Sequence, residues 1–371
     1  MQTSVGLYIH IPFCHSKCYY CDFYSRPLKE DTRGFVDALS VELSLRITSE
    51  TRLRTVYIGG GTPSILPLNQ LERLLKGIKK ENALLEFTIE ANPEDVSREW
   101  LETVKRLGID RVSMGVQTFD DAKLRVIGRR HTSTETRRAI EAIIESGLNY
   151  SIDLIYGLPG QSVKEWNDNL NILGEYCPPH FSAYGLSYEP GTRLYAGLQA
   201  GRYIQCSEED ILTMYENLVE FSVKHGYEHY EISNFSVPGK ESVHNSSYWD
   251  GIPYIGIGPG AHSFDGVNRF YNPADSKGYV DKLKRGELPL VMDAETDEER
   301  LNDIVISSLR TRKGLDWSRI TGFDEQIAGR LRENMTREER KGNLRVNSVG
   351  NYIIPHSKWL VSDDIFRNVM I

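Results

Sequence analysis

The chain has 371 residues, of which 40% are hydrophobic and 26% charged, an ordinary composition for a globular enzyme with one large and one small domain. The formal charge of −8 argues against a sequence-independent nucleic-acid binder, and no run approaches the roughly 18–20 apolar residues of a membrane span. We expect no secretory signal in the first residues, which lack a basic segment and a long apolar run. Of the five cysteines three are clustered, a distribution that does not resemble a disulfide framework. We therefore expect a cytoplasmic protein whose thiols are free to bind metal.

Short β-rich runs alternate with helical segments over the first 190 residues. The runs cover residues 5–13, 55–63, 86–94, 111–119, 150–160 and 180–192. Apolar residues recur at i, i+3, i+4 and i+7 in the segments 33–47, 69–80, 94–108 and 133–147. Strands that alternate with helices of this length predict an α/β fold with a parallel sheet, closed into a partial (β/α)6 barrel similar to a TIM barrel.

The pattern changes after residue 200. A helix is predicted at 207–225, loop-rich sequence follows, and helical periodicity returns at 297–312 before a two-stranded wing at 342–355. The motif "GIGPGAHSF" (256–264) is expected to be a tight loop, since it contains Pro259 and lacks the strand–turn–helix context of a nucleotide site. We therefore divide the chain into a core at 1–235, a connecting region at 236–290 and a small, mainly helical, winged-helix-like domain at 291–371.

Polar or glycine-rich residues follow the predicted strands at the end where barrels of this type place their chemistry. They are Cys14, Gly59–Gly61, Glu90, Gln117 and Asp153. Although they are spread over 140 residues, we expect them to converge at one mouth of the barrel.

Cys14, Cys18 and Cys21 form a C-x3-C-x2-C run. Thiolates bind soft or borderline metals, so zinc and an iron–sulfur cluster are the two options. His15 would complete a zinc site with the three cysteines. Iron–sulfur clusters normally take four cysteines, so three would leave one iron open to a small molecule.

The C-x3-C-x2-C run after a first strand, with Tyr20 before the third cysteine, resembles the radical S-adenosylmethionine superfamily. In that superfamily three cysteines hold a 4Fe-4S cluster, and S-adenosylmethionine binds its open iron. The motifs "YIHIPFC", "GGGTPS", "IEANPE", "GVQTF", "IDLIYGLPGQ" and "YEPGT" are similar to the oxygen-independent coproporphyrinogen III dehydrogenase (HemN-like) family. The likeness runs over essentially the whole chain, including a C-terminal domain of the HemN type.

The resemblance implies that Cys14, Cys18 and Cys21 hold the cluster. Glycines would let the backbone approach the cofactor, and Glu90 would accept hydrogen bonds from its ribose hydroxyls. Arg129 would pair with the cofactor's carboxylate, or else be a solvated charge at a helix end. The implied S-adenosylmethionine contacts are Tyr8, Tyr20, Gly60, Gly61, Thr62, Glu90, Gln117, Arg129, Asp153 and Gly185.

Two departures argue against coproporphyrinogen III dehydrogenase itself. Phe23 stands where the dehydrogenases carry a further cysteine, and Cys14 lies too close to Met1 for their N-terminal extension. The hexapeptide "HNSSYW" (244–249) resembles the H-N-x-x-Y-W motif of the HemW-type haem chaperones of this superfamily. Histidine is the common proximal ligand of haem, so His244 is a candidate haem ligand, the alternative being a hydrogen-bonding histidine.

The sequence therefore predicts a haem chaperone that carries a 4Fe-4S cluster with S-adenosylmethionine, binds haem as cargo, and delivers it to haem-requiring apoproteins such as respiratory enzymes. No catalytic residue is assigned, no nucleic-acid partner is expected, and a homodimer is one open oligomeric state. The alternatives are radical decarboxylation of porphyrinogen propionates by a coproporphyrinogen III dehydrogenase, radical chemistry on haem itself, and a plain zinc-binding scaffold.

Overall fold

The computed structural model describes residues 4–28, 32–78 and 84–371. The last two residues of the helix predicted at 69–80 lie outside this part of the chain. Twelve strands form one sheet in the order β14-β13-β12-β11-β1-β4-β5-β6-β7-β8-β10-β9. The six central strands from β1 to β8 are parallel to their neighbours in this order. This arrangement confirms the predicted α/β fold.

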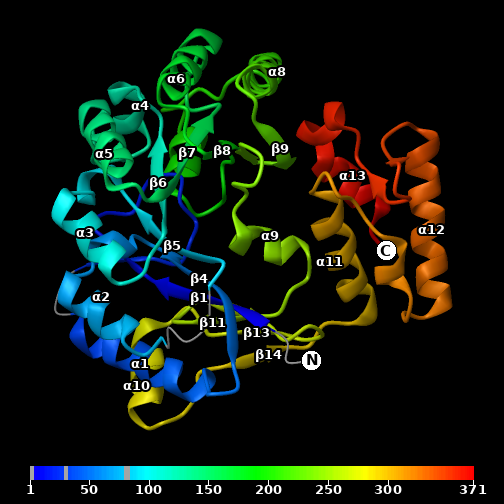
Figure 1. Ribbon diagram of the computed structural model, residues 1–371. Helices are drawn as coiled ribbons and strands as arrows, with labels where there is room; N and C mark the ends of the chain where they lie inside the picture. Colours follow the sequence, from blue (N-terminus) through cyan, green and yellow to red (C-terminus); the bar gives the residue numbers. More distant parts are fainter. Residues whose placement is uncertain (1–3, 29–31, 79–83) are drawn as a thin grey trace.

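The six central strands coincide with the six predicted β-rich runs. Their bounds are β1 Ser4–Ile11, β4 Arg52–Gly60, β5 Glu86–Ala91, β6 Arg111–Gln117, β7 Asn149–Tyr156 and β8 His180–Gly185. Their apolar side chains are mostly buried, as expected for strands covered on one face by helices. Figure 1 shows helices α1, α2, α3, α5 and α6 arranged around the outside of this curved sheet.

The helices begin and end at local sequence signals. Thr132 and Ser162 cap α5 and α6 in capping boxes with the glutamates three residues later. Gly147, with a φ of +71°, ends α5 in the left-handed conformation that glycine adopts readily. The helix bounds are α1 Arg33–Arg46, α2 Leu68–Leu75, α3 Arg98–Arg106, α4 Asp121–Val126, α5 Ser133–Ser146, α6 Val163–Tyr176, α7 Arg193–Gln199 and α8 Glu208–Lys224.

Short strands extend the sheet beyond the predicted barrel on both sides. At one edge β11 (Tyr254–Ile257) pairs in parallel with β1, and β12 (His262–Phe264), β13 (Arg269–Tyr271) and β14 (Val291–Asp293) follow in antiparallel order. At the other edge β10 (Asn234–Ser236) and β9 (Glu228–Glu231) continue from β8. A two-stranded pair, β2 (Phe13–Cys14) and β3 (Arg26–Pro27), frames the cysteine loop.

The segment 236–290, predicted to be rich in loops, is largely structured. It contains α9 (Val243–Trp249), β11, β12, β13 and α10 (Ser276–Lys284). The motif at 256–264, predicted to be a tight loop, holds the end of β11, a turn and all of β12. Strands of three or four residues are too short to show alternation, and β11 is stabilised by pairing with β1, far away in the sequence.

The C-terminal region is helical, as predicted, with a small hairpin. It contains α11 (Asp297–Leu309), α12 (Glu325–Arg340) and α13 (Ser362–Val369), and the hairpin of β15 (Arg345–Val346) and β16 (Tyr352–Ile353) lies within the predicted wing. Short 3-10 helices are η1 Pro63–Ile65, η2 Pro93–Asp95, η3 Trp317–Ile320 and η4 His356–Val361. The domain boundaries predicted at residues 235 and 290 stay predictions.

Backbone hydrogen bonds attach the C-terminal region to the β9 edge of the sheet. The amide of Ile232 donates to the carbonyl of Arg310 at 3.1 Å, and the amide of Arg312 donates to the carbonyl of Tyr230 at 3.1 Å. The helix α11 then stands beside α9, and α12 and α13 lie on the side of α11 away from the helices that cover the barrel (Figure 1). No helix within the described residues combines the length and apolar character needed to cross a bilayer.

Candidate functional site

The three clustered cysteines lie at the mouth of the barrel among hydrogen-bond donors. Cys14 ends β2, and Cys18 and Cys21 lie in the loop that follows it. The hydroxyl of Thr62 donates to the Sγ atom of Cys14 at 3.5 Å, and Nη1 of Arg129 donates to the Sγ atom of Cys18 at 3.6 Å. Donors and a positive charge next to sulfur favour the thiolate form, which is the form that binds metal.

When no metal is bound, burial and mutual repulsion disfavour the deprotonated form of the thiols in this loop. Burial raises the pKa of the Cys21 thiol to about 11, and it also raises the pKa of Cys14, with the neighbouring Cys18 adding to both shifts. A bound cation removes this penalty because it stabilises the deprotonated sulfur. The loop therefore has the donor set of a metal centre, and its thiols gain from a cation that stabilises their deprotonated form.

The zinc alternative requires His15 as its fourth ligand. His15 faces the carboxylate of Asp95 at 3.9 Å. Within the described residues, no three histidine, cysteine, aspartate or glutamate side chains lie close enough together to hold one metal ion. The choice between a zinc ion and an iron–sulfur cluster at these cysteines therefore stays a prediction.

Glycines let the end of β4 approach the cysteine loop closely. A Cβ atom on Gly61 would lie 2.6 Å from the carbonyl oxygen of Phe13 and 3.0 Å from the Sγ atom of Cys14. Gly60 has a φ of +112°, and a Cβ atom there would lie 2.6 Å from the ring of His10. The predicted glycine cradle is thus present, and its tightest contacts are with the cysteine loop and β1.

Glu90 points into the barrel mouth from the end of β5. Its carboxylate accepts hydrogen bonds from the hydroxyl of Tyr57 at 2.9 Å and the amide of Gly60 at 3.1 Å. A carboxylate has about four acceptor positions, so each oxygen keeps capacity for a further donor such as a sugar hydroxyl. Burial raises the pKa of Glu90 to about 7, with the charge of Asp153 adding to the shift.

This raised pKa gives a pH-dependent stability in the cofactor-free protein. Between its ordinary value of 4.5 and about 7, the folded chain holds a proton on Glu90 that the unfolded chain releases. The free energy of unfolding of the wild type, relative to Glu90→Gln, should therefore fall as pH rises through this window and then level off. The drop should be at most about 3 kcal/mol. Urea unfolding of the wild type and Glu90→Gln at a series of pH values measures this drop, and Glu102→Gln is the exposed control. If the stability of the wild type relative to Glu90→Gln instead rises with pH, the raised pKa of Glu90 is refuted.

Arg129 and Gln117 complete the group of strand-end residues. The guanidinium of Arg129 donates to the Asn92 side chain at 2.7 Å and to the carbonyl of Gly115, besides reaching Cys18. It is therefore an interior group, and the alternative of a solvated charge at a helix end is wrong. Gln117 has an unusual φ of +68°, and its amide lies 2.9 Å from the position that a Cβ atom of Gly115 would occupy.

Asp153 and Gly185 lie on the neighbouring strands β7 and β8. Asp153 accepts hydrogen bonds from the hydroxyls of Ser182 at 2.8 Å and Ser113 at 3.3 Å, and burial raises its pKa. The nearest side chain to Gly185 is Tyr156. The expected convergence is confirmed for the strand-end residues from Cys14 to Asp153, whereas Gly185 contacts none of the other predicted site residues.

The two predicted tyrosines have different surroundings. Tyr20 packs against Ile127, Ile155 and Leu158, and its surroundings include Cys18 and Arg129. Tyr8 lies on β1, and its hydroxyl is 3.1 Å from Nδ1 of His10. It faces a large cavity that adjoins the barrel mouth.

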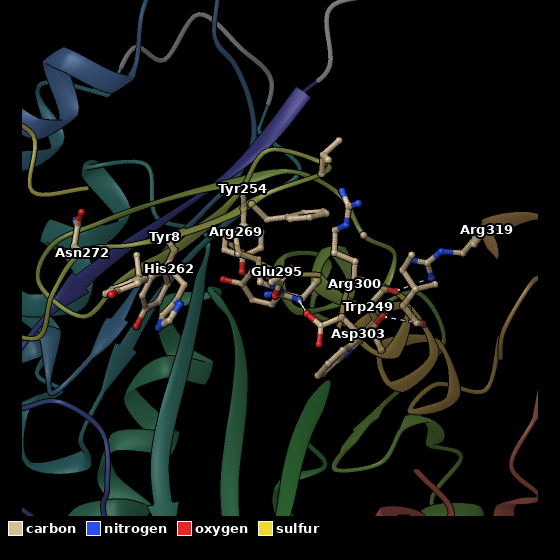
Figure 2. A pocket seen from close by; sticks show the side chains of 18 of the residues that line it. Tyr8, Trp249, Tyr254, His262, Arg269, Asn272, Glu295, Arg300, Asp303 and Arg319 are labelled. Atoms are coloured by element: carbon tan, nitrogen blue, oxygen red, sulfur yellow. Dashed lines mark hydrogen bonds and ion pairs between the residues drawn. The ribbon is translucent and has the colours of Figure 1, made fainter. Parts of the chain in front are cut away.

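This cavity, which we call the aromatic pocket, has a volume of about 1190 Å³. It lies between the cysteine loop, α9, the β11–β14 extension and the C-terminal region, and Figure 2 shows its walls from close by. Its aromatic lining residues are Tyr8, His10, Phe23, Tyr24, Tyr248, Trp249, Tyr254, His262, Phe264, Tyr271 and Phe323. A volume of this size with mostly apolar walls suits a large, flat ligand.

Charged groups lie along the far wall of the aromatic pocket (Figure 2). Arg269 is neutralised by Glu295, at 3.0 Å, and by Asp303. Arg319 instead donates to the Trp249 carbonyl at 3.3 Å and to the Ser308 hydroxyl at 2.7 Å. Within the described residues no carboxylate lies at ion-pair distance from Arg319, although Asp250 and Asp316 act on its charge from farther away.

Known proteins match the chain over most of its length. Residues 8–173 match the family model described as the radical SAM superfamily. "Heme chaperone HemW" of Bacillus subtilis (strain 168) is 35% identical over 97% of this chain and 97% of its own length. The chain belongs to the HemW family. The HemW of Lactococcus lactis subsp. lactis (strain IL1403) is 38% identical over 83% of this chain and 79% of its own length.

A solved structure agrees with the fold of this HemW family member. Coproporphyrinogen III oxidase (HemN) from Escherichia coli, described as a radical SAM enzyme, superposes with a TM-score of 0.83 at 22% identity, covering 100% of this chain and 90% of its own. This likeness confirms the predicted HemN-like fold. The predicted membership of the radical SAM superfamily and of the HemW-type chaperones is confirmed as well.

The H-N-x-x-Y-W motif of this HemW family member forms the helix α9. Nδ1 of His244 is 2.8 Å from the hydroxyl of Thr55, and Nε2 is 2.8 Å from the hydroxyl of Tyr248. The ring stacks on Tyr57 at 5.0 Å, and burial lowers its pKa to about 3. Since both ring nitrogens are engaged, the geometry supports the hydrogen-bonding alternative for His244 and gives no support to haem ligation.

Several functional neighbours were not predicted from the sequence. Glu86 caps α9 by accepting from the amides of Val243 at 2.8 Å and His244 at 3.2 Å. Tyr57 holds Glu90, and Asn92 holds Arg129. Asn92 follows β5 within the motif "IEANPE", so its position after a strand was a usable signal. Nothing local in the sequence marks Glu86 or Tyr57.

Proposed function

We propose that this HemW family member binds haem in the aromatic pocket and delivers it to haem-requiring apoproteins, with a 4Fe-4S cluster and S-adenosylmethionine at the adjoining barrel mouth. The observation that carries the proposal is the pocket itself, about 1190 Å³ in volume and lined by aromatic rings. A porphyrin is a flat apolar ring with acidic propionates. Aromatic faces stack on such a ring, and the charge of Arg319 suits a propionate.

The residues at the barrel mouth fit the two cofactors. Cys14, Cys18 and Cys21 would hold the cluster, whose open iron would bind S-adenosylmethionine. The Nε atom of Arg129 is buried without a hydrogen-bond partner, which leaves the guanidinium with a free donor for the cofactor's carboxylate. Glu90 would accept from the ribose. When bound, this pair supplies one-electron chemistry, and a carrier of intact haem needs none at the porphyrin.

The pocket and the barrel mouth share a wall. Phe23 and Tyr24 follow Cys21 after one intervening residue, and both line the aromatic pocket. The side chain of Phe23 is 67% exposed, which is unusual for a phenylalanine and leaves its face free to contact a ligand. Phe23, which stands where the dehydrogenases carry a further cysteine, would therefore contact haem bound in the pocket.

Titration of the anaerobically reconstituted protein with ferric haem, followed by Soret absorption, tests this proposal. We expect saturable binding that weakens by about tenfold in Trp249→Ala, since loss of one aromatic contact costs about 0.5–1.5 kcal/mol. Tyr176→Ala, on α6 outside the pocket, is the matched aromatic control. Transfer of the bound haem to apomyoglobin, used as a generic acceptor, measures delivery.

Two results would overturn the proposal. One is the absence of saturable haem binding by the wild type. The other is decarboxylation of coproporphyrinogen III by the protein with S-adenosylmethionine and a reductant, which would assign it to the alternative dehydrogenase activity.

A further inference from the structure

One histidine of this chain differs from all the others. All nine histidines lie within the described residues. Eight have a ring nitrogen in a hydrogen bond or facing a carboxylate: His10, His15, His131, His180, His225, His229, His244 and His356. In the part of the chain that the structure describes, the ring of His262 has no such partner. The side chain of His262 is exposed in the wall of the aromatic pocket, so its ring nitrogens are accessible to a ligand there.

His262 lies in the wall of the aromatic pocket. It begins β12, where it pairs with Tyr271, and the two ring centroids are 5.9 Å apart. The next residue, Ser263, is buried, and its hydroxyl accepts a hydrogen bond from the amide of Gly256 at 2.9 Å. Alternation along the strand therefore directs His262 and Phe264 to the pocket. Figure 2 draws the ring of His262 on the same side of the pocket as Tyr8, away from Trp249 and Arg319.

Buried hydrogen bonds hold the backbone next to His262 in place. The carboxylate of Glu42, which is fully buried, accepts hydrogen bonds from the amide of Gly258 and the side chain of Asn272, both at 2.9 Å. The amide of Asn272 in turn donates to the carbonyl of Ala261 at 2.9 Å. A ligand fixed on a strand and supported in this way is already oriented before its partner arrives.

We propose that His262 is the axial ligand of the haem iron in the aromatic pocket and that His244 acts as a positioning residue for α9. The inference rests on the haem-carrier function proposed above. Neutral imidazole is the common proximal ligand of haem iron, and Arg319, on the opposite side of the pocket, is placed to bind a propionate. The pKa of His262 is lowered by burial and by Arg269, so the ring is neutral at pH 7.

Ferric haem is the probe for this inference, with His262→Ala, His244→Ala and wild type compared by Soret absorption and electron paramagnetic resonance. In His262→Ala we expect a shifted Soret band, a changed spin state, and an affinity loss of at least about tenfold, the loss seen when even an outer partner of a metal ligand is removed. Free imidazole should restore the wild-type spectrum in His262→Ala, which a purely structural role would not allow. His244→Ala should keep the wild-type axial-ligand spectrum.

A second variant keeps the test decisive if His262→Ala folds poorly. His262→Cys should give the spectrum of a thiolate-ligated haem, because the new side chain would lie at the iron. Wild-type-like spectra and affinity in both variants would overturn the inference and leave the haem-carrier function standing. Absence of saturable binding by the wild type would overturn both. His225→Ala, remote from the pocket, controls for removal of a histidine.

Discussion

Replacing Cys18 with serine is expected to abolish the iron–sulfur absorption of the anaerobically reconstituted protein. The Sγ atom of Cys18 accepts from Arg129 at 3.6 Å, and its charge acts on both Cys14 and Cys21, so it stands at the centre of the proposed ligand set. A serine hydroxyl is a harder ligand that does not ionise at neutral pH. With two thiolates left, the cluster has too few soft ligands to persist. Iron and acid-labile sulfide content, measured after desalting, should fall close to zero.

Cys177→Ser is the matched control for this change. Cys177 is exposed, and its thiol donates to the carbonyl of Gly174 at 2.9 Å, a bond that a serine hydroxyl can also make. Its iron and sulfide content should equal that of the wild type. Full retention of iron and sulfide in Cys18→Ser would refute the assignment of Cys18 as a cluster ligand. Zinc in place of iron in the wild type would instead revive the zinc alternative.

Replacing Glu42 with alanine should cause the largest loss of stability of any single change at the edge of the sheet. Its buried carboxylate accepts from Gly258, Asn272, the Tyr279 hydroxyl at 2.5 Å, and Arg46 at 3.3 Å. Removing it leaves these donors buried without an acceptor, together with the charge of Arg46. The expected loss in the free energy of unfolding is about 3–5 kcal/mol.

Urea unfolding, together with hydrogen exchange at the Gly258 amide, measures this effect. Glu42→Gln keeps one acceptor oxygen and should lose less, about 1–3 kcal/mol. Glu102→Ala, on the exposed side of α3, is the control and should change stability by less than about 0.5 kcal/mol. A loss below about 1 kcal/mol in Glu42→Ala would show that the donors find other acceptors.

The barrel and its cysteine loop were predictable because their signals are local. Each central strand is a largely buried run with polar or glycine residues near its end, as with Glu90 on β5 and Asp153 on β7. Parallel strands necessarily bring such ends to one side of the sheet. The interior position of Arg129 was not predictable in the same way, because its partners Asn92 and Gly115 belong to two other strand ends.

The aromatic pocket was not predictable because no local pattern encodes it. Its walls come from segments as distant as Tyr8 and Phe323, and the segments 260–274 and 295–307 between them contribute further lining residues. His262 follows a glycine-rich turn in a strand of three residues, too short to display alternation. His244 sits in a recognised motif, but only the structure shows that both of its nitrogens are already hydrogen-bonded.

The pairing of β1 with β11 has a consequence for the order in which the protein is made. Gly6 pairs with Tyr254, so one edge of the first strand has no neighbour until the ribosome has added more than 240 further residues. At typical translation speeds this takes on the order of 10 to 50 s. The barrel mouth with its three cysteines is complete well before then, whereas the pocket still lacks most of its walls. A nascent chain that ends before β11 therefore has the cysteine loop without the pocket, and on the function proposed above it would lack the haem site.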